Sequence, residues 1–297
     1  MKPLFANGAA LLAALTWGIS GVPQKTVLQH LDPISVTGLT CLLGFIVVYP
    51  LARREYRVNR SRDTPQFAQI MTVALPFTIG VTLSQIGYGL TSVTNAGFFT
   101  NTAAVITPFA AWVVQRRRPN SWIFPASALT GMGLLLMGGG VTALTAGDLV
   151  CLCAAIAFSL WLLALGDHVG RFRNPKIITC AQLLVAGACC TMLGPLTYGM
   201  PTAAQISAAL PELLVIGMLS KGAAFLLNSS AQQHVHPAAI AILISTEAVF
   251  GSAIAVLWIN ETLSLMQVAG AVLVVCGVFL VCLLQIANAQ VTSHRPN

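Results

Sequence analysis

Long apolar segments alternate with short polar ones along the whole chain. Ten segments contain almost no charged side chain, and each has about the 17–25 residues that an α-helix needs to cross a bilayer. Charged or turn-forming residues separate most of them. The pattern predicts an all-α integral membrane protein with ten transmembrane helices. The expected helices are Phe5–Pro23, Pro33–Leu51, Phe67–Leu90, Ala96–Val114, Ile123–Leu144, Leu149–Leu165, Ile177–Tyr198, Leu210–Ser230, Ala238–Trp258 and Leu265–Ile286.

Composition agrees with this interpretation. Of the 297 residues 56% are hydrophobic and 8% are charged, whereas soluble domains carry about 25% charged residues. Ten spans and their loops use up the chain, so no soluble domain is expected. The first apolar segment could pass for a signal peptide, but nine more follow and no clear small-residue cleavage site closes it. We therefore expect an uncleaved first span.

The net charge of +7 comes from short basic clusters between the apolar segments, so it predicts topology and not nucleic-acid binding. With the N-terminus inside, Lys25 is the one basic residue of the loops that falls outside, and the acidic Asp32, Asp148, Glu212 and Glu261 fall outside with it. Both termini are therefore expected to be cytoplasmic. The basic residues on the cytoplasmic side are Lys2, Arg53, Arg54, Arg57, Arg60, Arg62, Arg116, Arg117, Arg118, Arg171, Arg173, Lys176 and Arg295.

The chain repeats itself weakly at a spacing of about 140 residues. Leu11–Trp17 resembles Leu149–Trp161, and Tyr88–Phe99 resembles Ser230–Ala241. Two repeats, residues 1–144 and 145–297, would each hold five helices. Because five is odd, the halves would have opposite topology, as in many secondary transporters.

Several motifs resemble the drug/metabolite transporter superfamily. They are Trp17-Gly18, Gly147-Asp148, and the run Trp258–Leu263 followed by Gly270 and Gly277. The chain is most similar to the ten-helix EamA-type exporters, which include bacterial aromatic amino acid exporters. The resemblance implies a multi-pass permease of the bacterial inner membrane, with a central cavity and alternating access.

The first half departs from that family pattern. Gln115 and the run Arg116–Arg118 stand where a glutamate is usual. We interpret the arginines as a topology anchor.

Two ionisable residues lie near the middle of their predicted spans, Lys221 in the eighth and Glu247 in the ninth. At about 1.5 Å of rise per residue, Lys221 lies roughly 20 Å and Glu247 roughly 16 Å from the turn near His236. A charge at that depth needs compensation. One hypothesis is a structural ion pair between the two side chains. The other is that Lys221 binds a substrate carboxylate and Glu247 an ammonium group or a transported proton.

Aromatic and amide side chains supply a second set of candidate substrate-binding residues. Rings would form a stacking wall and amides would orient polar groups, as in other small-molecule sites. The alternatives are membrane-interface or lipid-facing positions for the rings, and interhelical hydrogen bonds for the amides. The aromatic candidates are Trp17, Tyr88, Phe98, Phe99 and Trp161, and the amide candidates are Gln85, Asn101 and Asn228.

Glycines within the spans predict close helix contacts and not phosphate binding. These glycines are Gly80, Gly87, Gly89, Gly131, Gly133, Gly138–Gly140, Gly270 and Gly277. The cysteines, among them Cys151 and Cys190, lie in apolar segments and act there as small hydrophobic residues. The histidines are too scattered for a metal site, so neither a metal nor a cofactor is expected.

These observations favour a secondary transporter that exports small metabolites, most of all amino acids, and not an enzyme. A carrier of nucleotide sugars or other phosphorylated metabolites would need several cations in its cavity, and only Lys221 is well placed. An intramembrane enzyme would need paired carboxylates, a Ser/His arrangement or metal ligands. A scaffold or receptor fits poorly with an inverted repeat. The expected partners are a small-molecule substrate and the lipid bilayer, and we take the chain as a monomer.

Overall fold

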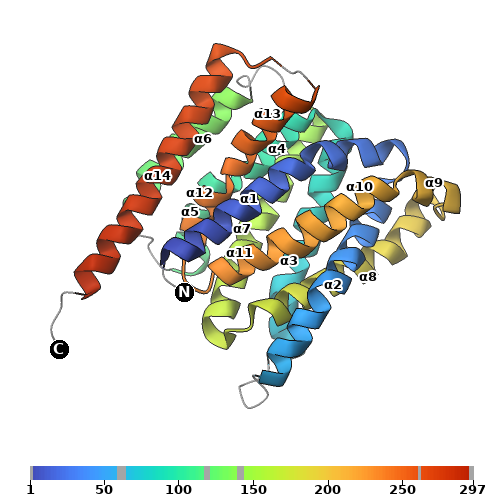
Figure 1. The fold of residues 1–297 in the computed structure, drawn as a ribbon, viewed down its shortest axis with the longest axis horizontal. Coiled ribbons are helices and arrows are strands. Elements are labelled where there is room, and N and C mark those ends of the chain that lie inside the picture. Colours follow the sequence, from blue (N-terminus) through green and yellow to red (C-terminus); the bar gives the residue numbers. More distant parts are fainter. Residues whose placement is uncertain (1–2, 59–64, 117–120, 139–143, 260–261, 294–297) are drawn as a thin grey trace.

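The computed structural model describes residues 3–58, 65–116, 121–138, 144–259 and 262–293, and within these ranges it contains helices and no strands (Figure 1). The first half contains α1 (Pro3–Thr26), the 3₁₀-helix η1 (Val27–Gln29), α2 (Pro33–Val58), α3 (Phe67–Leu90), α4 (Val93–Asn101), α5 (Ala103–Val114) and α6 (Ile123–Met137). The second half contains α7 (Ala146–Phe172), α8 (Pro175–Tyr198), α9 (Ala203–Ala208), α10 (Leu210–Leu214), the π-helix η2 (Val215–Ala224), α11 (Phe225–Ala231), α12 (Pro237–Ile244), α13 (Thr246–Ile259) and α14 (Leu265–Ser293).

The described residues form nine helical segments long and apolar enough to cross a membrane, together with the shorter apolar helix α6. The all-α membrane fold expected from the sequence is thus confirmed. Large apolar side chains such as Leu196 and Leu257 are more than four-fifths exposed, as expected for a surface that faces lipid. The short helix α9 was not predicted, because its start at the Thr202–Gln205 capping box changes hydropathy little.

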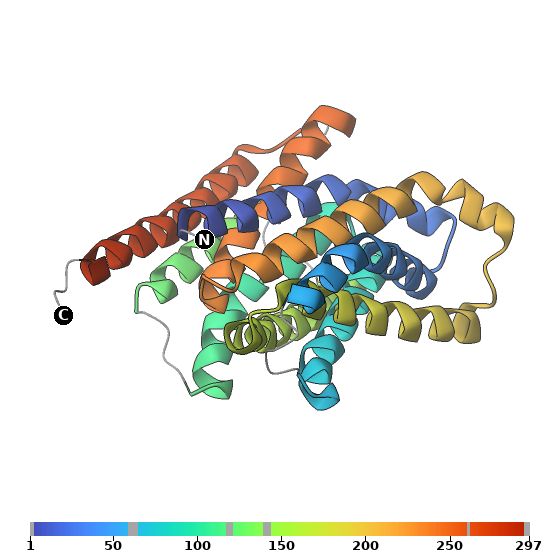
Figure 2. The same ribbon diagram turned by 60° about the horizontal axis from the view of Figure 1, so that its bottom comes forward.

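The helices pack as pairs around α1. Helices α6 and α14 form one edge, α2 and α8 lie at the opposite edge, and α3 packs along α7 (Figures 1 and 2). Helix α1 crosses the centre, between α10–α11 on one side and α12–α13 on the other. The first residues of α1 and the last of α14 lie toward the same end of the bundle, at the left in Figure 2.

Glycines allow the closest of these contacts, as the sequence predicts. A Cβ added at Gly270 would lie 2.5 Å from the carbonyl oxygen of Gly133, across the α6–α14 contact. Gly38 was not among the predicted packing glycines, but a Cβ there would lie 2.6 Å from the backbone nitrogen of Thr191, across the α2–α8 contact. Gly139 and Gly140 lie outside the described residues.

We expect Gly270→Ala to lower the free energy of unfolding by about 1–3 kcal/mol, because the new methyl group meets backbone atoms that cannot rotate away. The control is Gly8→Ala on α1, where an added Cβ would have no atom within 4 Å. Thermal unfolding of both variants in the same detergent measures the difference. Equal midpoints for the two variants would contradict this assignment of Gly270 to helix packing.

Polar side chains fix several helix ends. Lys25 Nζ donates to the carbonyl oxygens of Tyr88 and Thr91, at 2.7 and 2.8 Å, and so caps the last turn of α3. Asp148 completes a capping box with Thr145 at the start of α7 and accepts a hydrogen bond from Thr91 Oγ1 at 2.8 Å. These contacts give Lys25 and Asp148 structural roles at the end of the bundle away from the N-terminus.

Part of the topology prediction falls on residues that the structure leaves undescribed. These residues are Lys2, Arg60, Arg62, Arg117, Arg118, Glu261 and Arg295.

Candidate functional site

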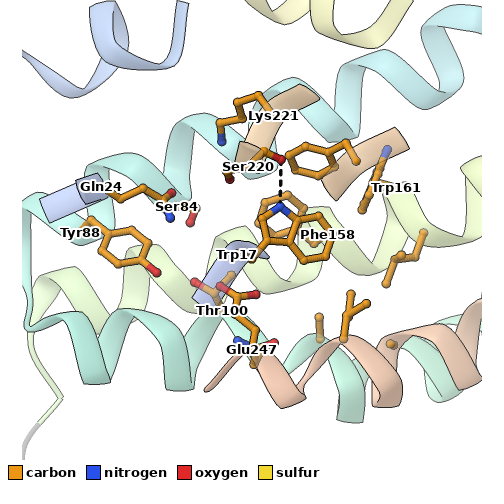
Figure 3. A pocket seen from close by; sticks show the side chains of 16 residues that line it. Trp17, Gln24, Ser84, Tyr88, Thr100, Phe158, Trp161, Ser220, Lys221 and Glu247 are labelled. Atoms are coloured by element: carbon orange, nitrogen blue, oxygen red, sulfur yellow. Dashed lines mark hydrogen bonds between the residues drawn. The ribbon is translucent and has the colours of Figure 1, made fainter. Parts of the chain in front are cut away.

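A cavity of about 70 Å³ lies at the centre of the helix bundle (Figure 3). Helices from both halves of the chain contribute to its wall, and the wall is mostly apolar with a few polar groups, as in other small-molecule sites. The residues that line it are Trp17, Gln24, Ser84, Tyr88, Thr100, Asn101, Ala103, Phe158, Trp161, Leu162, Ser220, Lys221, Phe225, Ala241, Ile244 and Glu247.

A cluster of aromatic rings forms one wall of this cavity. Phe225 makes edge-to-face contacts with Trp17 and Trp161, with ring centroids 4.9 and 5.4 Å apart. Both indole nitrogens have acceptors: Trp17 Nε1 donates to the carbonyl oxygen of Ser220 at 3.1 Å, and Trp161 Nε1 to Gln182 Oε1 at 2.8 Å. The indole rings are therefore held in fixed orientations by hydrogen bonds as well as by packing.

Lys221 enters the cavity from the π-helix η2. Such segments are rare and often occur at functional sites. The side chain is 5% exposed, and Nζ lies 5.6 Å from the centroid of the Phe225 ring, within the range of a cation–π contact. Helix α2 packs tightly behind it, because a Cβ at Gly44 would lie 2.9 Å from Lys221 Cβ. The ammonium group is thus buried and directed to the cavity.

Glu247 lies at a break in the ninth span. Ser245 Oγ and Thr246 Oγ1 donate to the carbonyl oxygens of Ile242 and Leu243, at 2.6 and 2.7 Å, where α12 ends and α13 begins. Hydroxyl groups that bond back to the preceding turn compete with the helical pattern. Glu247 follows in the first turn of α13, where a carboxylate interacts favourably with the helix dipole.

The fourth span is broken in the same way. Thr102 Oγ1 donates to the carbonyl oxygen of Phe99 at 2.5 Å, between α4 and α5. Asn101 immediately precedes this break; its amide nitrogen donates to the carbonyl oxygen of Gly97 at 2.9 Å, and the residue lines the same cavity as Glu247. Interrupted helices at matching positions of two halves are typical of transporter binding sites. Neither break was predicted from the sequence.

Lys221 and Glu247 do not form an ion pair within the described part of the chain. Both line the central cavity, and Figure 3 shows the Trp17 ring between them. The structural ion pair was one of the two hypotheses from the sequence, and the structure does not form it. One cavity therefore presents an ammonium group and a carboxylate group on different walls.

A second cavity of about 60 Å³ adjoins the first. Trp17, Tyr88 and Glu247 line both cavities, so the two are neighbours along these side chains. Its other lining residues are Gly18, Gly21, Val22, Val93, Thr94, Gly97, Phe98, Met137, Ala248, Gly251 and Ser252.

The structure brings six of the ten candidate residues together in the central cavity, namely Trp17, Tyr88, Asn101, Trp161, Lys221 and Glu247. Phe98 lines the second cavity. Gln85, Phe99 and Asn228 line neither cavity. Gln85 instead donates to the carbonyl oxygen of Gln24 at 2.8 Å and so supports the wall from behind.

Several lining residues were not predicted from the sequence, including Gln24, Ser84 and Phe225. Helical spacing from the candidates would have indicated two of them. Ser84 precedes Tyr88 by four residues, and Phe225 follows Lys221 by four.

The chain also matches known proteins over most of its length. The model of the EamA-like transporter family matches it twice, at residues 4–139 and 145–283. The chain belongs to the EamA-like transporter family. Its relatives include an uncharacterized transporter of Archaeoglobus fulgidus, 24% identical over 288 residues that cover 95% of this chain and 87% of the relative. They also include the uncharacterized transporter YwfM of Bacillus subtilis, 22% identical, with 91% of each chain covered.

A solved crystal structure has the same fold. It superimposes with a TM-score of 0.76 at 14% identity, covering 95% of this chain and 98% of the other. At that identity the likeness concerns the fold alone. As a member of the EamA-like transporter family with nine membrane-spanning segments in its described part, this protein is a membrane transporter.

Proposed function

We propose that this EamA-family protein exports small zwitterionic metabolites, most of all amino acids, by alternating access. Lys221 binds the substrate carboxylate, and Glu247 with Asn101 binds the ammonium group. The observation that carries the proposal is the central cavity, which offers one buried cation and one carboxylate on different walls. Fixed complementary charges of this kind would replace the hydration of both ends of a zwitterion.

The charges of the cavity also favour a zwitterionic substrate over a phosphorylated one. A phosphate monoester or a nucleotide sugar carries about two negative charges near pH 7, and Lys221 is the only Lys or Arg in the described lining. Glu247 in the same cavity would repel such an anion. The proposal therefore favours a substrate without net charge over a nucleotide sugar.

The remaining features of the proposal concern orientation and movement. The protein would lie in the bacterial inner membrane with both termini in the cytoplasm, supported by the basic residues of the loops. Two inverted repeats, residues 1–144 and 145–297, would rock about the cavity between them. Two successive matches to one family model, and breaks in the fourth and ninth spans, support this division.

Counterflow in liposomes that contain only this protein tests the substrate class. We expect uptake of radiolabelled amino acids, and competition by unlabelled ones. Amines without the carboxylate, and acids without the ammonium group, should compete at least tenfold less well, because each leaves one buried charge without a partner. Equal competition by an amine or an organic acid would contradict the assigned roles of Lys221 and Glu247.

A further inference from the structure

The second cavity has a wall built from glycines. Four of its lining residues are glycines, and they come from three helices: Gly18 and Gly21 from α1, Gly97 from α4, and Gly251 from α13. Gly18 has a packing role, since a Cβ there would lie 2.9 Å from the backbone nitrogen of Gly251. That contact lets α1 and α13 cross closely.

The other three glycines have no such role. A Cβ at Gly97 would have no atom within 4 Å, one at Gly21 would lie 3.5 Å from Val93 Cγ1, and one at Gly251 would lie 3.8 Å from the nearest atom. Alanine would fit at all three positions. Glycine within a helix is less favourable than alanine, so these residues lower helix stability with no gain in packing. What they provide is empty space.

This space lies beside the charged part of the central cavity. Glu247 lines both cavities, and Trp17 and Tyr88 flank it in both. A ligand whose ammonium group binds Glu247 can therefore extend from its neighbouring carbon into the second cavity. The wall also contains Phe98, whose ring packs against the C-terminal end of α6, since a Cβ at the C-cap residue Gly138 would lie 2.8 Å from it. Met137, an adaptable side chain, completes it.

We propose that the second cavity is the subsite for the apolar side chain of the substrate, and that Gly21, Gly97 and Gly251 set the size of the side chain it accepts. The ligand class is an α-amino acid with an apolar side chain, whose charged groups bind Lys221 and Glu247 in the central cavity. This proposal rests on the function proposed above. It adds a selectivity that the charged groups alone do not give, since every amino acid carries them.

Binding of a homologous series tests the subsite independently of transport. For glycine, alanine, norvaline and norleucine, the affinity of the wild-type protein should rise about fourfold with each added methylene, the usual gain for burying one such group. In Gly97→Val the affinity should rise from glycine to alanine but not further to norvaline and norleucine, because the valine side chain occupies the cavity. Thermal shift or isothermal titration with the purified full chain measures both series.

The matched control is Gly8→Val, which places the same side chain at a glycine with open space outside both cavities. This variant should show the same dependence of affinity on side-chain length as the wild-type protein. An equal loss for all four ligands in Gly97→Val, or an unchanged series, would overturn the subsite, as would a wild-type series that is flat or shows no binding.

Counterflow with the same ligands separates the two proposals. If the series behaves as expected but no ligand is transported, the proposed function fails and the subsite stands. If all four are transported and the affinities do not depend on side-chain length, the subsite fails and the proposed function stands.

Discussion

Lys221→Met is expected to reduce amino acid uptake at least a hundredfold while leaving the fold as stable as the wild type. The ammonium group forms no direct ion pair among the described residues, and the Trp17 ring lies between it and Glu247, so its removal breaks no such pair. Methionine keeps most of the apolar stem and its contact with Phe225. The substrate carboxylate, in contrast, would lose the only cation in the described lining of its cavity.

Three variants and one control decide this role. Lys221→Met, Glu247→Gln and the double variant are compared by proteoliposome uptake and by thermal unfolding, with Lys176→Met at the start of α8 as the same change outside the cavity. A structural ion pair predicts that each single change destabilises the protein by about 3–5 kcal/mol and that the double change restores it. Full transport by the double variant would rule out the binding role.

The sequence predicted the spans because hydropathy directly reports contact with lipid. The expected helix Phe67–Leu90 matches α3 to the residue, and Lys221 and Glu247 were recognised because charge within a span is rare. The breaks at Thr102 and Ser245 were not predicted. One threonine or serine hardly changes the hydropathy of a span, although its hydroxyl group can redirect the backbone hydrogen bonds.

The lining of the site was harder to predict for a related reason. In spans that are apolar on all sides, periodicity does not show which face points inward. Ser84 and Phe225 therefore gave no signal of their own. Depth alone also placed Lys221 and Glu247 at one level without showing that Trp17 lies between them.

Asn228 is a candidate whose role does not follow from the cavity in this conformation. It lies on α11, one turn beyond Phe225, toward the end of the bundle where α1 begins. The side chain is fully buried, and neither its nitrogen nor its oxygen has a hydrogen-bond partner among the described residues. Burying an amide in this way costs about 1–3 kcal/mol. An apolar residue of similar size would stabilise this conformation better.

The unpaired amide of Asn228 would serve transport if it binds the substrate in the other transport conformation. On the proposed path from the cavity toward the start of α1, a substrate would leave the aromatic cluster of Trp17, Trp161 and Phe225 and meet Asn228, three residues beyond Phe225 on α11. An amide can replace part of the hydration of either charged group along this path. In that case this path would be polar when open and would carry an unsatisfied amide when closed.

Asn228→Leu is therefore expected to raise the free energy of unfolding by about 1–3 kcal/mol and to reduce uptake at least tenfold, because it stabilises the closed path and removes the polar group. The neighbouring Ser229→Ala is the matched control. Ser229 Oγ donates to the carbonyl oxygen of Phe225 at 2.8 Å and accepts from Thr179 Oγ1 at 2.7 Å, so its loss should cost about 0.5–1.5 kcal/mol and spare transport. Thermal unfolding and proteoliposome uptake measure both variants. An Asn228→Leu protein that is less stable than the wild type, or equally active, would show that the amide is structural.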